Sequence, residues 1–293
     1  MSMRIIDKLF FDDAYGCAIN SNNDTDDTYY VKRPTVNSWF ADPFIVSNKG
    51  KSFVFVEYMS YLRNLGSIAV APVENNRIGC FKEIIKEPFH MSFPNVFEYN
   101  GYFYMIPETF KSKQLRLYKC LDFPYNWKFQ TTIANGVEYV DSIIFIEGDD
   151  ALIISYDISD SLNPKLVAGD YNFITGAYIP IELSGNHSLD RPGGSFFEDL
   201  GGIYRVTQDC RACYGDYLHL LKVDSINMRS LEDHEIRELH FSDFSFDNCK
   251  GIKHVHTLNS NAEYKIVDFR ARCFYPHKLL QRLWTKITNR QLL

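Results

Sequence analysis

The feature that most constrains the fold of this chain is a hairpin pattern that recurs about every 50 residues. Each copy has a short apolar strand, a polar turn with Gly, Asn or Asp, and a second apolar or aromatic strand, which predicts a β-hairpin. The polar residues that open the first four copies stand 50, 49 and 50 residues apart: Asp42, Ser92, Asp141 and Arg191. A fifth copy opens at His256 after 65 residues, and the excess is attributed to a charged insertion around residues 230–251.

Further apolar strands between the hairpins bring each copy to about four strands. A repeat of this length and strand number is typical of a β-propeller blade. We therefore predict an all-β, five-bladed propeller that forms one domain over residues 1–275, with the N-terminal strand closing the ring. The blades should start near residues 36, 88, 138, 188 and 252. The alternative is a two-sheet sandwich, which would not require such regular phasing.

Composition narrows the class of protein. The 293 residues carry a net charge of −6, which argues against a nucleic-acid partner. An aromatic content of 15% excludes disorder and favours strands. Seven scattered cysteines suit reduced thiols, and neither a signal peptide nor a membrane-spanning stretch is found, so we expect a cytoplasmic protein. Cys210 and Cys213 form a lone C-x-x-C, for which His219 is weak support as a zinc site.

The last residues differ from the rest of the chain in charge. No acidic residue follows Asp268, whereas six basic residues do: Arg270, Arg272, Lys278, Arg282, Lys286 and Arg290. The last four stand four residues apart, which would place them on one face of a helix. We predict a short amphipathic helix over residues 276–293. It either docks on the propeller or makes a peripheral contact with an anionic membrane surface.

The hairpin positions predict where a functional site would lie. In a propeller, the first strand of each hairpin lines the central channel and the second strand returns to the same rim. Side chains at the start and end of the hairpins should therefore meet in one funnel. The polar residues at these positions form the candidate site: Asp42, Glu57, His90, Ser92, Glu108, Asp141, Asp157, Arg191, Gln208, Asp209, His256 and Asp268.

Carboxylates that face one another, with arginine and histidine among them, suit sugar chemistry. Cleavage of a glycosidic bond needs one carboxylate as base or nucleophile and one protonated carboxyl as acid. Crowding of like charges raises the pKa of one carboxyl and so permits that division. Aromatic rings at the rim would stack on sugar faces: Trp39, Phe40, Phe93 and Tyr214. The sequence has no phosphate-binding loop, dinucleotide fingerprint, zinc-protease motif or nucleophile elbow.

Several of these segments resemble known propellers. The motif WFADPF (39–44) resembles the first blade of the five-bladed glycosidases of the arabinanase, levansucrase and invertase type. Residues 90–109, 140–142, 191–215 and 256–259 resemble the N-terminal domain of plant glucosamine inositolphosphorylceramide transferases. Related domains accompany formyltransferase-like proteins in bacterial polysaccharide clusters. The resemblance covers residues 36–270 and implies a five-bladed fold and a glycan context.

The resemblance also implies roles for individual residues. By analogy with the glycosidases, Asp42 would be the base or nucleophile and Asp141 a second acidic residue near the sugar. Those enzymes place the acid on a later blade, where this chain has Arg191, so Glu108 is the nearest substitute. The remaining residues would bind substrate: Glu57, His90, Ser92, Arg191, Gln208, Asp209, Tyr214 and His256. The resemblance further allows a structural cation in the channel beside His256, and no other cofactor is predicted.

Two functions follow from this set. The first is an enzyme that makes or breaks a glycosidic bond during surface-glycan assembly, acting on a sugar, nucleotide-sugar or lipid-linked glycan. The second is a non-catalytic sugar-binding module that works with a partner enzyme, because the plant proteins carry the transferase-like part in a separate C-terminal domain. Open carboxylates across a funnel would favour the enzyme, whereas carboxylates buried in ion pairs with Arg191 would favour the module.

Overall fold

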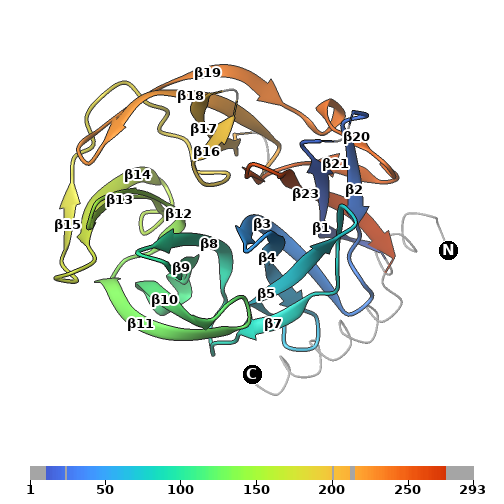
Figure 1. Ribbon diagram of the computed structural model, residues 1–293, viewed down its shortest axis with the longest axis horizontal. Coiled ribbons are helices and arrows are strands. Elements are labelled where there is room, and N and C mark those ends of the chain that lie inside the picture. Colours follow the sequence, from blue (N-terminus) through green and yellow to red (C-terminus); the bar gives the residue numbers. More distant parts are fainter. Residues whose placement is uncertain (1–10, 24, 200, 212–214, 275–293) are drawn as a thin grey trace.

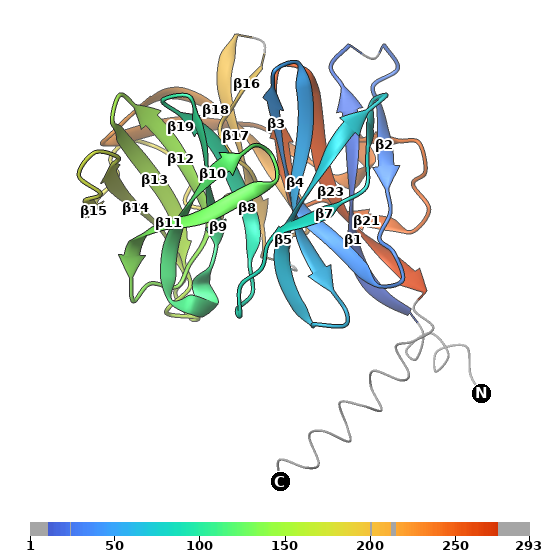
Figure 2. The same ribbon diagram turned by 60° about the horizontal axis from the view of Figure 1, so that its bottom comes forward.

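The chain forms a ring of five β-sheets around a central channel (Figure 1). The computed structural model describes residues 11–23, 25–199, 201–211 and 215–274. A view turned toward the edge of the ring shows the strands of each sheet running along the channel (Figure 2). This is the five-bladed propeller that the hairpin spacing predicts. The predicted C-terminal helix over residues 276–293 lies outside the described residues, and no helix within them is long and apolar enough to cross a membrane.

Blades one and two follow the predicted order of two hairpins each. Blade one contains β3 (Ser38–Asn48), β4 (Lys51–Ser60), β5 (Leu65–Glu74), β6 (Arg77–Ile78) and β7 (Lys82–Ile85). Blade two contains β8 (Ser92–Tyr99), β9 (Tyr102–Glu108), β10 (Gln114–Asp122) and β11 (Asn126–Asn135), with a 3-10 turn, η1 (Phe110–Ser112), after β9. The turns between β3 and β4 and between β8 and β9 hold Gly50 and Gly101 at positive φ, as tight hairpin turns require.

Blades three and four have the same antiparallel order. Blade three contains β12 (Tyr139–Glu147), β13 (Asp150–Asp157), β14 (Lys165–Asn172) and β15 (Tyr178–Ile181). Blade four contains β16 (Phe197–Asp199), β17 (Gly202–Asp209), β18 (Tyr217–Asn227) and β19 (Ser230–Leu239). The attribution of residues 230–251 wholly to an insertion is therefore wrong, because the first ten of them form the outer strand of blade four. The charges of β19 are those of an exposed edge strand.

The fifth blade is built from both ends of the chain. It contains β22 (Leu258–Ser260), β23 (Tyr264–Phe274), β1 (Phe11–Ser21), β2 (Thr28–Lys32), β20 (Ser245–Phe246) and β21 (Ile252–His254). A second 3-10 turn, η2 (Phe241–Asp243), leads from blade four toward β20. Strand β1 pairs with β23 along its whole length, from Phe11 opposite Phe274 to Ser21 opposite Tyr264. Hydrogen bonds between the two ends of the chain thus close the ring.

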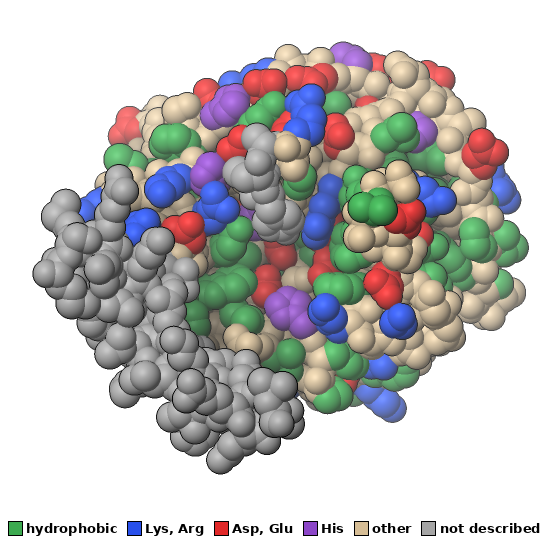
Figure 3. Space-filling model, turned by 180° about the vertical axis from the view of Figure 1, so that it is seen from behind, with side chains coloured by type: hydrophobic (Ala, Val, Ile, Leu, Met, Phe, Trp, Pro, Cys, Tyr) green, Lys and Arg blue, Asp and Glu red, His purple; other side chains and the backbone are tan. Residues whose placement is uncertain are grey.

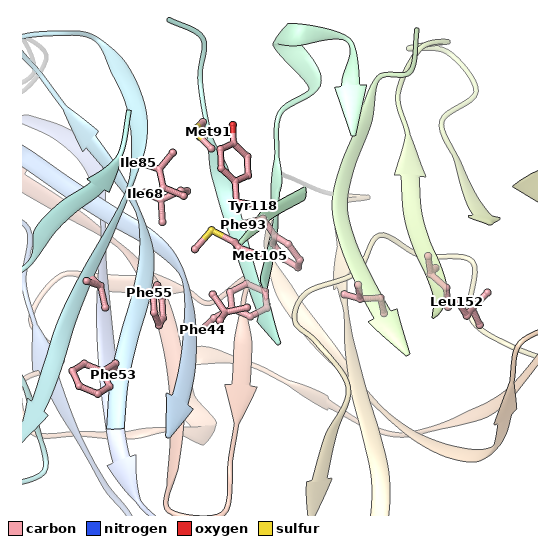
Figure 4. Packing of buried hydrophobic residues seen from close by; sticks show 14 of the residues in the cluster. Phe44, Phe53, Phe55, Ile68, Ile85, Met91, Phe93, Met105, Tyr118 and Leu152 are labelled. Atoms are coloured by element: carbon pink, nitrogen blue, oxygen red, sulfur yellow. The ribbon is translucent and has the colours of Figure 1, made fainter. Parts of the chain in front are cut away.

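The hydrophobic core lies between neighbouring blades. Apolar side chains on facing sheets pack against one another there. The largest cluster includes side chains from blades one and two, such as Phe44 and Phe93, and extends to Leu152 of blade three (Figure 4). In it the rings of Phe44 and Phe93 meet edge to face, with their centroids 4.9 Å apart. Because each sheet is covered on both faces by its neighbours, its strands are apolar in long runs. The polar side chains at the ends of the inner strands are left to line the channel.

Candidate functional site

The starts of the inner strands and the ends of the second strands surround a cavity of about 210 Å³. On the face shown in Figure 3, acidic, basic and histidine side chains gather in a central hollow. All five blades contribute to the lining of the cavity: Tyr15, Trp39, Ala41, Asp42, Glu57, His90, Ser92, Glu108, Asp141, Arg191 and His256. Eight of the residues predicted for the site are therefore brought together here, from positions up to 214 residues apart in the sequence.

A break in strand pairing positions the two aspartates of the cavity. The inner strands of blades one, two and three each shift register at the same point, after Ala41, Ser92 and Val140. The next residues, Asp42, Phe93 and Asp141, have φ values of 49°, 43° and 47°. Residues other than glycine rarely adopt this conformation, and such bulges re-aim side chains beside functional sites. The counterpart of Asp42 in blade two is thus Phe93, one residue beyond the predicted Ser92.

Asp42 accepts hydrogen bonds from blades two and five. Its Oδ1 atom accepts from the hydroxyl of Thr257 at 3.1 Å and lies 3.3 Å from Nε2 of His256. Its Oδ2 atom accepts the backbone N–H of Phe93 at 3.1 Å. The Asp42 carboxylate is 8% exposed and held on both oxygens. A carboxyl group held in this way is fixed in orientation by its neighbours.

The buried Asp268 contacts His256 at Nδ1, the ring nitrogen that does not face Asp42. Oδ2 of Asp268 lies 2.8 Å from Nδ1 of His256, and the same carboxylate accepts the backbone N–H groups of Asp42, His256 and Thr257. Burial alone would lower the pKa of His256, but the charge of Asp268 and the contact with Asp42 raise it well above its usual value. The imidazole is therefore held between two carboxyl groups, which favour its protonated form.

A second network joins blades two, three and four. Arg191 pairs through Nε with Oδ2 of Asp141, and its NH2 lies 3.6 Å from Oε2 of Glu108. The side-chain amide of Gln208 donates to the same Asp141 oxygen at 2.7 Å. Burial and the neighbouring charge of Asp141 raise the pKa of Glu108 well above its usual value, although Arg191 opposes the shift. Glu108 is thus a carboxyl that holds its proton more tightly than usual, beside the arginine-paired Asp141.

Glu57 and His90 form a third contact, between blades one and two. Oε1 of Glu57 lies 3.0 Å from Nε2 of His90, and Nδ1 of His90 accepts the backbone N–H of Gly66 at 3.1 Å. Burial raises the pKa of Glu57, and His90 partly offsets that rise. Burial lowers the pKa of His90, but the hydrogen bond and the charge of Glu57 outweigh it, so that the pKa is raised.

The remaining predicted residues lie elsewhere. Gln208 stands behind Asp141 rather than in the cavity wall, and Tyr214 lies outside the described residues. Asp209 does not line the cavity: its carboxylate pairs with Arg211 and lies 3.5 Å from Nε2 of His219. Adjacent residues of a strand point to opposite faces, so Gln208 and Asp209 cannot both face the channel. Asp157 likewise lies outside the lining.

Of the three predicted rim residues that the structure describes, only one lies at the cavity. Trp39 lines the cavity, but Phe40 and Phe93 are buried in the core between blades. The sequence patterns missed Tyr15, whose ring lies 5.4 Å from that of Trp39 and 4.9 Å from that of His256. Nothing in β1 marks Tyr15 as a site residue, because its position depends on pairing with the opposite end of the chain.

Three residues of the channel have side chains that could bind a cation. Asp42, His256 and Asp268 offer ligand atoms that lie within 4.8 Å of one another. These three residues are therefore the ones that would hold a structural cation in the channel. Both carboxylates also accept several hydrogen bonds, so the same groups form an internal network of hydrogen bonds.

Sequence comparison identifies the relatives of this propeller. The family described as "Glucosamine inositolphosphorylceramide transferase 1, N-terminal" matches residues 29–262. This chain belongs to that family. It is 29% identical over 211 residues to glucosamine inositolphosphorylceramide transferase 1 of Arabidopsis thaliana, which covers 68% of this chain. The Oryza sativa subsp. indica protein of the same name is 28% identical over 206 residues. The chain spans only about a quarter of these relatives, 27% and 28% of their lengths.

Solved structures share the fold at low sequence identity. An α-L-arabinofuranosidase of Podospora anserina superposes with a TM-score of 0.59 at 10% identity, covering 80% of this chain and 90% of its own. A family 117 glycoside hydrolase of Zobellia galactanivorans gives a TM-score of 0.54 at 10% identity, covering 90% and 91%. These structures show that the propeller fold of this chain is shared with glycoside hydrolases.

Proposed function

We propose that the channel cavity binds one sugar unit of a glycan, so that the propeller acts as a recognition module for a partner glycan-assembly enzyme. One observation favours binding over catalysis. Each carboxyl that would perform the chemistry is already engaged: Asp42 by three donors, Asp141 by Arg191 and Gln208, and Glu108 beside that pair. Side chains held in this way are preorganised for recognition, because few of them must be ordered on binding.

The lining of the cavity supports a sugar as the ligand. Carboxylates and Arg191 offer paired acceptors and donors for hydroxyl groups, and the rings of Tyr15 and Trp39 form an apolar wall on one side. The relatives' name points to glucosamine, whose ammonium group would pair with the carboxylates. We include sugars attached to nucleotide or lipid carriers among the proposed ligands. We also propose a cytoplasmic location, as the sequence indicates.

The test is isothermal titration calorimetry of the full chain against glucosamine, N-acetylglucosamine, mannose and UDP-N-acetylglucosamine, run beside an assay for released or transferred sugar. We expect at least one sugar to bind without turnover. Replacing Trp39 with alanine should weaken that binding at least tenfold, because it removes the aromatic wall. Phe129→Ala, which removes an exposed ring on the outer strand β11, is the control and should leave affinity unchanged. Equal affinity of both variants and the wild type would contradict the proposal.

Glu108 favours a second candidate, an enzyme that transfers or hydrolyses the bound sugar. A carboxyl with a raised pKa, as burial gives Glu108, is the kind of group that a leaving oxygen needs as an acid. Asp42 would then act as base or nucleophile. This candidate predicts measurable turnover that falls about 10²- to 10⁴-fold in Glu108→Gln while sugar binding persists. Binding with no product from the wild-type chain would exclude it.

A further inference from the structure

The outer hairpin of blade four gathers titratable side chains away from the channel. Strand β18 presents His219, and β19 presents Glu235 and Glu238. His219 pairs across the hairpin with Glu238, and a register shift after Leu220 brings Glu235 opposite the next residue, Leu221. The bulge therefore turns both glutamates toward the face that carries the histidine. One ligand atom from each of these three residues lies within 4.8 Å of the other two.

His219 is the residue that points to a ligand. Its side chain is 9% exposed, and Nδ1 lies 3.1 Å from Oε2 of Glu235. Within the described part of the chain, Nδ1 nevertheless makes no hydrogen bond of acceptable geometry. A buried ring nitrogen without a hydrogen bond is costly. The cost disappears if the atom has a lone pair that coordinates a cation.

The other nitrogen of His219 completes the arrangement. Nε2 lies 3.5 Å from Oδ2 of Asp209. The Asp209 carboxylate is itself held in place, because it accepts hydrogen bonds from the backbone N–H and the guanidinium of Arg211. Histidines that bind metals typically donate their second N–H to such a carboxylate, which orients the ring and fixes its tautomer.

Glu238 is also held in place. Its Oε1 atom accepts a hydrogen bond from the hydroxyl of Tyr217 at 3.3 Å, and its Oε2 atom lies 3.1 Å from Nε2 of His240. The rings of Tyr217 and His240 are 4.5 Å apart. These contacts hold one carboxylate near His219, while Glu235 remains half exposed and free to adjust to a ligand.

We propose that His219, Glu235 and Glu238 bind one divalent transition-metal ion, with zinc as the best fit. One imidazole nitrogen and two carboxylates form a ligand set typical of zinc, and water would occupy the remaining position. The ion would link β18 to β19 and offset two adjacent negative charges at the edge of the blade. The site is separate from the sugar cavity and does not depend on the function proposed for it.

The test is calorimetric titration of the chelator-treated full chain with Zn²⁺. We expect one ion per chain and a higher melting temperature with zinc, because the ion binds only the folded hairpin. The double variant E235Q/E238Q should lose at least a hundredfold in affinity. It keeps the fold, since both side chains are about half exposed. Asp209→Asn should weaken binding about 10- to 100-fold.

The matched control is His234→Asn on the same hairpin. His234 pairs with Asp224 at an exposed position and should not alter zinc affinity. No zinc binding by the wild-type chain would overturn the proposal. Unchanged binding by E235Q/E238Q would overturn it as well. Loss of binding in Cys210→Ser with retention in E235Q/E238Q would assign the ion to the cysteine pair instead.

Discussion

Glu108 shows how its surroundings determine the protonation of one residue. Burial raises the pKa of Glu108, the charge of Asp141 raises it further, and Arg191 only partly opposes them. In the unfolded chain the same carboxyl titrates near the ordinary glutamate pKa of 4.5. The folded state therefore binds more protons than the unfolded state above that pH, and this group makes the free energy of unfolding fall as pH rises.

The prediction concerns Glu108→Gln. A neutral amide has no proton to lose, so above about pH 4.5 the free energy of unfolding of the variant should fall less with rising pH than that of the wild type. Each unit by which the pKa is raised corresponds to about 1.4 kcal/mol. Urea unfolding at a series of pH values measures the slope. Glu98→Gln, on the same hairpin but exposed, is the control and should have the wild-type slope, and identical slopes for all three chains would contradict the assignment.

His256 also makes the free energy of unfolding fall as pH rises, but over a different pH range. Its raised pKa means that its ion pairs stabilise the fold fully below the unfolded value of about 6.5 and are lost as pH rises through the folded value. His256→Gln leaves Asp42 and Asp268 buried without their cation, which should cost about 3–5 kcal/mol. Urea unfolding at pH 6 should show this loss, and the difference from the wild type should narrow at high pH. A loss that does not change with pH would contradict the charged histidine.

At the scale of elements, blade four depends on a buried ion pair. Arg205 on β17 and Asp233 on β19 are 0% and 1% exposed, and NH2 of Arg205 lies 2.7 Å from Oδ2 of Asp233. The two strands lie on either side of β18, so the pair ties together three strands. Both side chains also bond the backbone of Ser188, which fixes the connection that enters the blade.

Removal of one partner should therefore strongly lower the free energy of unfolding. Asp233→Asn leaves the Arg205 guanidinium buried without its counter-ion, and we expect a loss of about 3–5 kcal/mol. The double variant R205M/D233N should lose less than the two single changes together, because no charge is left unpaired. Urea unfolding of the four chains forms the cycle. A loss under about 1 kcal/mol in Asp233→Asn would show that blade four does not depend on this pair.

At the scale of the whole molecule, stability depends on the closure of the ring by β1 and β23. Gly16 lies in the middle of β1, opposite Phe269. A Cβ atom at Gly16 would stand 2.6 Å from the ring of Phe269 and 2.7 Å from the backbone oxygen of Lys32. Both distances are too short, so any side chain here would force the two ends of the chain apart.

Gly16→Ala tests the importance of this closure. Overpacking of this kind costs about 1–3 kcal/mol, and each kcal/mol lowers the melting temperature by roughly 2–4 °C in a chain of this size. Gly202→Ala in β17 is the control, because its Cβ would meet only ordinary contacts at 3.4 Å or more. Thermal melts by circular dichroism compare the two. Equal melting temperatures would contradict the prediction, because they would show that β1 can move away from its neighbours at Gly16 without loss of stability.

The sequence by itself was enough to predict the propeller and most of the residues that line its channel cavity. Hairpins at regular steps predict blades, and polar residues at equivalent hairpin positions must meet, because every inner strand starts at the same end of the channel. For this reason Asp42 and His256, which are 214 residues apart, could be assigned to one cavity. These inferences need only the period of the repeat and the alternation of side chains along a strand.

The tertiary structure decided what the side chains do. The bulges of the inner strands place Phe93, not Ser92, at the position of the two aspartates, and a local pattern cannot reveal a bulge. Pairing of the chain ends brings Tyr15 to the cavity. Above all, Arg191 binds Asp141 and Asp268 binds His256 through contacts that the spacing of the hairpins does not specify. Charge and protonation depend on distance and burial, and sequence spacing contains neither.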